Sequence, residues 1–165
     1  MSADAAELKA LMLRTPRRTL AVAESLTCGR VQAQVGAISG ASEFFLGGMT
    51  AYSLDQKVKL LGVERAAAEK VNCVSAAVAE QMARGAGKLF GADIAAATTG
   101  YAEPSAEWQV AQPFAWFALA RRDSANWILT SRRIECPGAS RLETQERVAG
   151  ATIAGLVALL RELRA

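Results

Sequence analysis

The segment from Asp93 to Thr98 constrains the fold of this chain more than any other. It reads Asp-Ile-Ala-Ala-Ala-Thr, an apolar run without alternating polar positions. A strand of this kind presents neither face to water, so both of its faces need a cover. Strands covered on both faces are typical of sheets that lie between two layers of helices. The segment therefore predicts a buried strand in a layered α/β fold.

Strand and helix patterns alternate along the rest of the chain. We expect strands at residues 19–23, 49–52, 93–98, 114–120 and 127–134, and helices at 3–14, 30–38, 54–61, 76–90 and 140–163. The alternation over the first two-thirds predicts βαβ units, and the last two strands follow one another as a hairpin. We therefore predict one domain over residues 1–165, an α/β/α sandwich with a mixed, mostly parallel sheet.

The chain contains no histidine, which removes many catalytic and metal sites. Ser-His-Asp triads, Cys-His pairs and histidine-based zinc sites are all excluded. A base that works near neutral pH must then be a carboxylate, a tyrosine, a cofactor or a lysine with a lowered pKa. The three cysteines have no repeated spacing, so they make a poor zinc site and fit a reducing, cytoplasmic compartment. We expect no metal and no cofactor.

The charge and hydropathy patterns argue against two classes of partner. The net charge is only +3 and the basic residues are scattered, whereas nucleic-acid binding leaves a denser basic footprint. No apolar stretch approaches the roughly 20 residues of a membrane span, and the acidic, helical N-terminus does not read as a secretory signal. We expect a protein that binds neither nucleic acid nor membrane.

Polar loops at the carboxyl ends of strands build the sites of such folds, and residues 24–29 and 98–104 are two such loops. The candidate nucleophiles in loops are Ser25, Thr27, Cys28, Ser42 and Thr99. Tyr52, Lys57, Lys59 and a few carboxylates are the candidate bases. A desolvated lysine has a lowered pKa, and a serine with a lysine can hydrolyse an amide without histidine. The alternative is that Lys57 is a solvated helix residue and that the serines are turn or cap residues.

Four runs of sequence carry a family resemblance. In chain order they are AESLTCGR, GASEFFLGGMTAYSLDQKVKLLGV, CVSAAVAEQMARGA and GADIAAATTG. They resemble the CinA C-terminal domain family, also known as the nicotinamide mononucleotide deamidase family, over about residues 19–104 and more loosely beyond. The resemblance implies a single α/β sandwich that hydrolyses the carboxamide of nicotinamide mononucleotide, giving nicotinate mononucleotide and ammonia without a metal. It also implies a homo-oligomer, and the apolar segment 44–46 looks like an exposed interface.

The resemblance also assigns a site. The family's serines fall on Ser25 and Ser42, its tyrosine on Tyr52 and its lysine on Lys57, and we take these four as catalytic. The family's threonine falls on Thr99 and its arginine on Arg141. We expect the substrate to be bound by those two residues and by polar or glycine positions in the turns, namely Thr27, Gly29, Gly48 and Gly100. The residues alone do not decide whether Ser25 or Ser42 attacks.

Two positions depart from the family pattern. Cys28 stands where a glycine is usual, and we interpret it as a small buried residue rather than a nucleophile. Glu103 replaces a glycine of the family's T-G-x-A-G-P loop, and the glycine pair that follows is absent. Carboxylates there would repel a phosphate if they faced the pocket. Tyr101 and Trp108, in the same loop, either stack on a ring or cover the core.

Two functions follow from these observations. The first is an amidohydrolase, and the second is a diverged module that binds a nucleotide or a partner chain without catalysis. A lysine within about 3 Å of Ser25 or Ser42 favours the enzyme. A Glu103 side chain paired with Lys57 or Arg141 across the pocket favours the diverged module.

Overall fold

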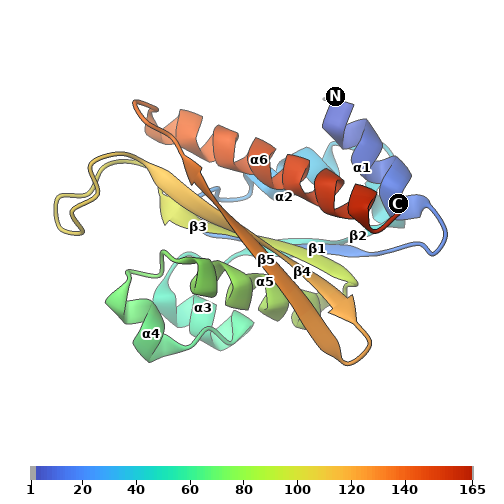
Figure 1. Cartoon of the computed structure of the whole chain (residues 1–165), viewed down its shortest axis with the longest axis horizontal. Coiled ribbons are helices and arrows are strands. Elements are labelled where there is room, and N and C mark those ends of the chain that lie inside the picture. Colours follow the sequence, from blue (N-terminus) through green and yellow to red (C-terminus); the bar gives the residue numbers. More distant parts are fainter. Residues whose placement is uncertain (1–2, 165) are drawn as a thin grey trace.

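A β-sheet in the order β2-β1-β3-β4-β5 forms the middle layer of the protein (Figure 1). The computed structural model describes residues 3–164. The strands are β1 (Leu20–Glu24), β2 (Phe45–Thr50), β3 (Ile94–Tyr101), β4 (Phe114–Asp123) and β5 (Asn126–Glu135). β1 pairs in parallel with β2 and β3, whereas β3–β4 and β4–β5 are antiparallel. Within the described chain, β4 alone therefore runs against the other strands, and the predicted mixed sheet is confirmed.

Helices cover both faces of this sheet, as Figure 1 shows. One layer contains α1 (Ala3–Leu13), α2 (Arg30–Gly36) and α6 (Arg141–Glu162), and the other contains α3 (Leu54–Leu61), α4 (Arg65–Lys70) and α5 (Ala76–Phe90). The side chains of β3 alternate between the two layers, with Ile94 and Ala96 in one core and Ala95 and Ala97 in the other. The central strand is thus buried on both faces, as its apolar run predicts.

The prediction for the second strand was wrong in its position. β2 begins at Phe45 and ends at Thr50, so Gly47 and Gly48 lie inside the strand and Tyr52 lies beyond it. Parallel pairing with β1 holds the glycines in the sheet despite their low strand propensity. The predicted interface at 44–46 is corrected in part, because Phe44 is buried in the core and only Leu46 is clearly exposed.

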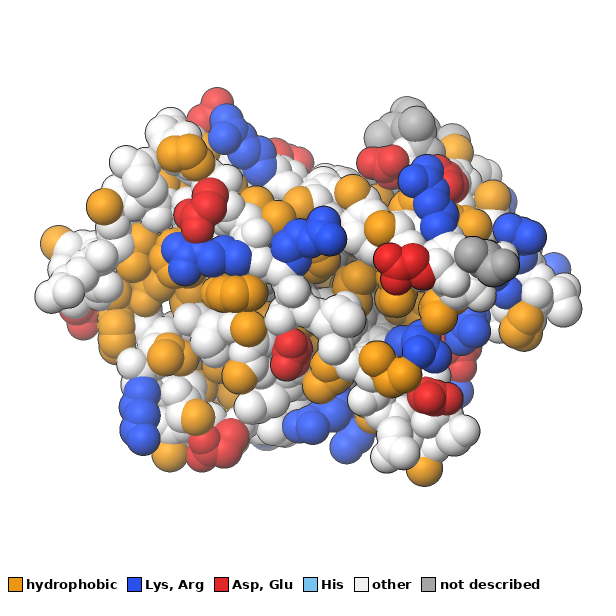
Figure 2. Space-filling model, in the orientation of Figure 1, with side chains coloured by type: hydrophobic (Ala, Val, Ile, Leu, Met, Phe, Trp, Pro, Cys, Tyr) orange, Lys and Arg blue, Asp and Glu red, His pale blue; other side chains and the backbone are white. Residues whose placement is uncertain are grey.

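One additional helix and one shorter helix also differ from the prediction. α4 was not expected, and it begins where the Glu64 carboxylate accepts hydrogen bonds from the amides of Ala66 and Ala67. α2 ends at Gly36, two residues before the expected end. No helix within residues 3–164 is long and apolar enough to cross a membrane. On the face drawn in Figure 2, basic and acidic side chains are interspersed.

Candidate active site

The carboxyl ends of β1 and β3 bring two predicted site residues together. The strands pair in parallel up to Ala23 and Ala97, and the amide of Ser25 then donates a hydrogen bond to the carbonyl of Thr98 at 3.1 Å. Ser25, directly after β1, and Thr99, near the end of β3, therefore stand side by side near the carboxyl ends of these two strands. This is the edge at which an α/β sheet usually builds its site.

A buried glutamate shapes the turn that holds Ser25. The Glu24 side chain is fully buried, and its carboxylate accepts hydrogen bonds from the amides of Gly29, Val31 and Gln32 at 2.9, 3.1 and 2.8 Å. It also accepts one from the Thr27 hydroxyl at 2.6 Å. The carboxylate thus meets the amides at the start of α2, where a negative charge is favoured.

Lys57 faces Ser25 from the first half of α3. Its side chain is 1% exposed, and Nζ lies 3.0 Å from Ser25 Oγ and 2.6 Å from the carbonyl oxygen of Tyr52. Burial lowers the pKa of Lys57, because the charged form loses its hydration, while the nearby Cys73 opposes this shift. A solvated helix lysine is therefore excluded, and the amine lies within proton-transfer distance of one predicted nucleophile.

Ser25 and Lys57 line the inner compartment of a cleft. This compartment has a volume of about 290 Å³, and Cys73, Thr99 and Gly100 also line it. The Thr99 hydroxyl donates to the carbonyl of Cys73 at 2.7 Å, so it ties β3 to the turn after α4. Burial raises the pKa of the Cys73 thiol. Cys73 is a lining residue that the sequence did not predict.

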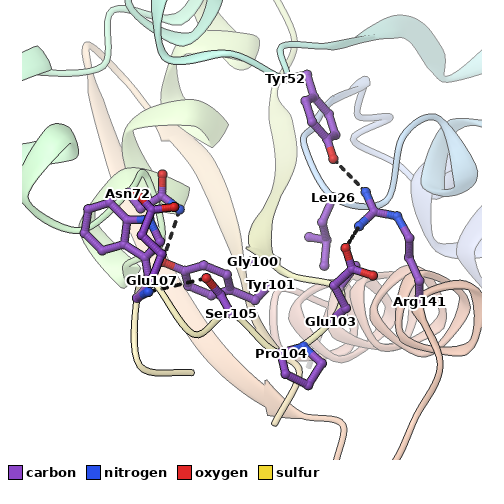
Figure 3. Close-up of a pocket in the computed structure, with 12 residues that line it drawn as sticks. Leu26, Tyr52, Asn72, Gly100, Tyr101, Glu103, Pro104, Ser105, Glu107 and Arg141 are labelled. Carbon is purple, nitrogen blue, oxygen red and sulfur yellow. Dashed lines mark hydrogen bonds and ion pairs between the residues drawn. The ribbon is translucent and has the colours of Figure 1, made fainter. Parts of the chain in front are cut away.

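An outer compartment of about 440 Å³ adjoins the inner one (Figure 3). The two share Leu26, Tyr52, Asn72, Gly100 and Tyr101. Tyr101 accepts a hydrogen bond from the Asn72 side chain at 3.2 Å, and Trp108 lies in the wall with 38% of its surface exposed. The structure thus places Tyr101 at the end of β3 rather than in the predicted loop, and the rings of Tyr101 and Trp108 both line the compartment.

Arg141, in the first turn of α6, bridges two residues of the outer compartment. Its Nη1 donates to Glu103 Oε1 at 3.0 Å and its Nη2 to Tyr52 Oη at 2.9 Å (Figure 3). The Tyr52 ring therefore points toward Arg141, and Tyr52 meets Lys57 through its backbone carbonyl. These contacts join α6 in one layer to the segment before α3 in the other.

Other predicted site residues lie elsewhere. Ser42 is exposed in a short 3₁₀ helix (Ala41–Glu43) that precedes β2, so it lies at the opposite end of the parallel strands from Ser25. Gly48 is inside β2, where an added Cβ would stand 2.7 Å from the carbonyl oxygen of Val22. Thr27 is buried between Glu24 and Thr98, 2.7 Å from the Thr98 hydroxyl.

Two residues of the turn before α2 also differ from expectation. The amide of Gly29 already donates to Glu24, so it is engaged in holding the turn. Cys28 has a φ of 48°, the left-handed conformation in which glycine is usual, and its thiol is exposed. The interpretation of Cys28 as a buried residue was wrong, because the turn directs this position outward.

The two criteria set by the sequence are both met, in different compartments. Lys57 contacts Ser25 in the inner one, as expected of an enzyme. Glu103 is paired with Arg141 in the outer one, as expected of a diverged module. Across residues 3–164, no three side chains of the His, Cys, Asp and Glu types gather as metal ligands would.

Comparison with known proteins identifies the family. A family model described as the CinA C-terminal domain matches residues 2–160. A CinA-like protein of Picosynechococcus sp. is 40% identical over 119 residues, which are 72% of this chain and 28% of that protein. A CinA-like protein of Synechococcus sp. is 49% identical over 92 residues, or 56% of this chain and 22% of that protein. The chain spans only about a quarter of the length of these relatives.

Solved structures agree over nearly the whole chain. The competence damage-inducible protein A of Klebsiella pneumoniae superposes with a TM-score of 0.84 and 28% identity, covering 96% of this chain and 95% of that one. A competence/damage inducible protein of Agrobacterium tumefaciens gives a TM-score of 0.82 and 28% identity, covering 96% and 97%. The chain belongs to the CinA C-terminal domain family.

Proposed function

We propose that this protein is an amidohydrolase that acts on the carboxamide of nicotinamide mononucleotide or of a closely related pyridinium compound. The observation that carries the proposal is the Lys57 amine, buried and 3.0 Å from Ser25 Oγ. A serine and a lysine with a lowered pKa supply a nucleophile and a base without histidine. The family resemblance supports the choice of a pyridine carboxamide as the substrate.

The reaction begins with the neutral form of Lys57. One of its N–H groups stays on the carbonyl of Tyr52, and its lone pair accepts the proton of the Ser25 hydroxyl. Ser25 Oγ then attacks the amide carbon, and the carbonyl oxygen becomes an oxyanion that needs donors. The backbone amide of Leu26, directly after the nucleophile and beside both compartments, is our candidate donor.

Collapse of this tetrahedral intermediate, followed by hydrolysis of the resulting ester, completes the reaction. The C–N bond breaks, Lys57 returns its proton to the leaving nitrogen, and ammonia departs from an acyl ester on Ser25. Water then gives a proton to Lys57 and attacks the ester carbon, and the C–O bond to Ser25 breaks. Ser25 recovers its proton, so the balance is one amide and one water consumed, and one carboxylic acid and one ammonia formed.

Ammonia release from nicotinamide mononucleotide tests the proposal. We expect release by the wild-type chain and a fall of about a thousandfold or more in Lys57→Met and Ser25→Ala, because either change removes a partner of the proton transfer. Lys59→Met is the matched control, since Lys59 is an exposed lysine of the same helix. Folded wild-type protein that releases no ammonia from any pyridinium carboxamide contradicts the proposal.

The Glu103–Arg141 pair favours a second candidate, the diverged binding module. In that case the cleft would bind its ligand with Arg141 held by Glu103, and Ser25 and Lys57 would carry no reaction. Calorimetric binding of the same compounds by wild-type protein, without ammonia release, would support this candidate. Assembly into a homo-oligomer stays a prediction, and Ser42 could join Ser25 in a site only from a second copy, because the two lie at opposite ends of the sheet.

A further inference from the structure

The charges of the outer compartment do not suit an anionic ligand. Of the described residues that line it, Arg141 is the one cation, and Glu103 and Glu107 are the anions. Arg141 is already engaged, because one nitrogen donates to Glu103 and another to Tyr52. A phosphate that approached Arg141 would place its oxygens beside the Glu103 carboxylate on the same guanidinium. Like charges so placed disfavour binding unless one of them leaves.

The same compartment suits a cation. Its wall contains the rings of Tyr52, Tyr101 and Trp108 together with the two carboxylates. Aromatic faces and carboxylates both attract a positively charged, planar group such as a pyridinium ring. Lys57 lies buried at the base of the inner compartment and does not line the outer one, so Arg141 is the cation that an anion in the outer compartment would meet.

We propose that Glu103 is a specificity-determining residue, and that the cleft selects an N-ribosylated pyridinium carboxamide whose ribose carries no phosphate. This inference rests on the proposed amidohydrolase function. The Glu103 carboxylate is paired with Arg141, which is the one cation among the described lining residues and therefore the group that an anionic tail would meet. A substrate without that tail leaves the pair intact, whereas a phosphorylated one has to displace Glu103 or bind beside it.

The ratio of kcat/KM for ammonia release from nicotinamide riboside to that from nicotinamide mononucleotide measures this selectivity. We expect a wild-type ratio of roughly ten or more, and a fall of about tenfold or more in Glu103→Gln, mainly through a lower KM for the phosphorylated compound. Glu103→Gly, which removes the side chain paired with Arg141 and leaves the bond from Arg141 to Tyr52, is expected to change the ratio at least as much. Asp123→Asn, the same charge change at the far end of β4, is the matched control and keeps the wild-type ratio.

A wild-type preference for the phosphorylated compound overturns the inference, and so does a ratio that Glu103→Gln leaves unchanged. If neither the wild type nor any variant releases ammonia from either compound, the amidohydrolase proposal fails. Calorimetry on the same proteins then tests separately whether the cleft discriminates against the phosphate. The inference is supported if the wild type binds nicotinamide riboside more tightly than nicotinamide mononucleotide and if Glu103→Gln reduces or reverses this preference. Equal affinities, or no binding of either compound, overturn it.

Discussion

At the scale of single residues, burial sets the chemistry of the inner compartment. Lys57 and Ser25 are both buried, and each has a defined partner, whereas an exposed lysine would keep its charge at neutral pH. The phenol of Tyr52 binds Arg141, and only its carbonyl reaches Lys57. The side chain of Tyr52 therefore lies in the outer compartment against Arg141, and its backbone contacts the lysine of the inner one.

The lowered pKa of Lys57 makes a prediction for the pH dependence of the reaction. Because the free amine is the base, kcat/KM should rise with pH as Lys57 loses its proton, with a midpoint below the ordinary lysine value of 10.5. The measurement is ammonia release over a series of buffers. Tyr52→Phe should keep the midpoint, since it leaves the carbonyl in place, and a wild-type midpoint at or above 10.5 would contradict the assignment of Lys57.

Residue by residue, the motifs marked candidate side chains, but they did not show which of them lie together. Ser25 and Lys57 lie 32 positions apart and are in contact, whereas Ser42, the other serine offered as a partner of Lys57, lies at the opposite end of the strands. Cys73 had no such signal, because it reaches the pocket through a tight turn in which Asn72 and Cys73 both have positive φ, 47° and 61°. Glu24 was predicted only as part of a polar turn. Its structural role was missed because its partners are mostly backbone amides, which no pattern of side chains reveals.

At the scale of elements, the ends of helices hold the site. α3 begins after Ser53, whose hydroxyl accepts from the amide of Gln56, and so places Lys57 one turn into the helix. α6 begins after Ser140, where a capping box with Glu143 fixes the first turn that contains Arg141. The long helices α5 and α6 were predicted to within one residue, whereas the short α4 was missed although Glu64 caps it. β2 was misplaced because pairing with β1 outweighs the local preference of its glycines.

Removal of the Ser140 side chain tests whether the cap of α6 stabilises the protein. Ser140→Ala should lower the free energy of unfolding by about 1 kcal/mol, since the amide of Glu143 loses its acceptor at a helix start. Urea unfolding followed by circular dichroism measures the change. Ser140→Thr keeps a hydroxyl and should lose much less, and equal losses in the two variants would show that the cap bond contributes nothing.

At the scale of the whole molecule, the layers give the three cysteines very different surroundings. Cys28 is exposed, Cys73 lies half-buried in the cleft, and Cys136 is buried in the core. Burial also raises the pKa of the Cys73 and Cys136 thiols, which lowers the fraction of reactive thiolate. The layered fold was predicted from the alternation of strands and helices and from one apolar strand, but the outward direction of Cys28 depends on a left-handed turn that composition does not reveal.

Thiol labelling tests this arrangement. At neutral pH the native protein should react rapidly at Cys28 and slowly at the other two cysteines, whereas the denatured chain should react at all three. Mass spectrometry after timed alkylation gives the site and the rate. The Cys28→Ser protein should lose the rapid phase, and rapid labelling that persists in this variant would contradict the description of the turn.

The cleft draws its two compartments from separate parts of the fold. The Ser25–Lys57 pair depends on β1 and α3, whereas the Arg141–Glu103 pair depends on the start of α6 and an exposed loop after β3. If the proposed function holds, the reaction and the choice of ligand therefore depend on different stretches of sequence. Substitutions in one surface loop would then change which ligand binds without altering the residues that react. On the same proposal, related chains that keep the lysine pocket are expected to share a reaction more often than a substrate.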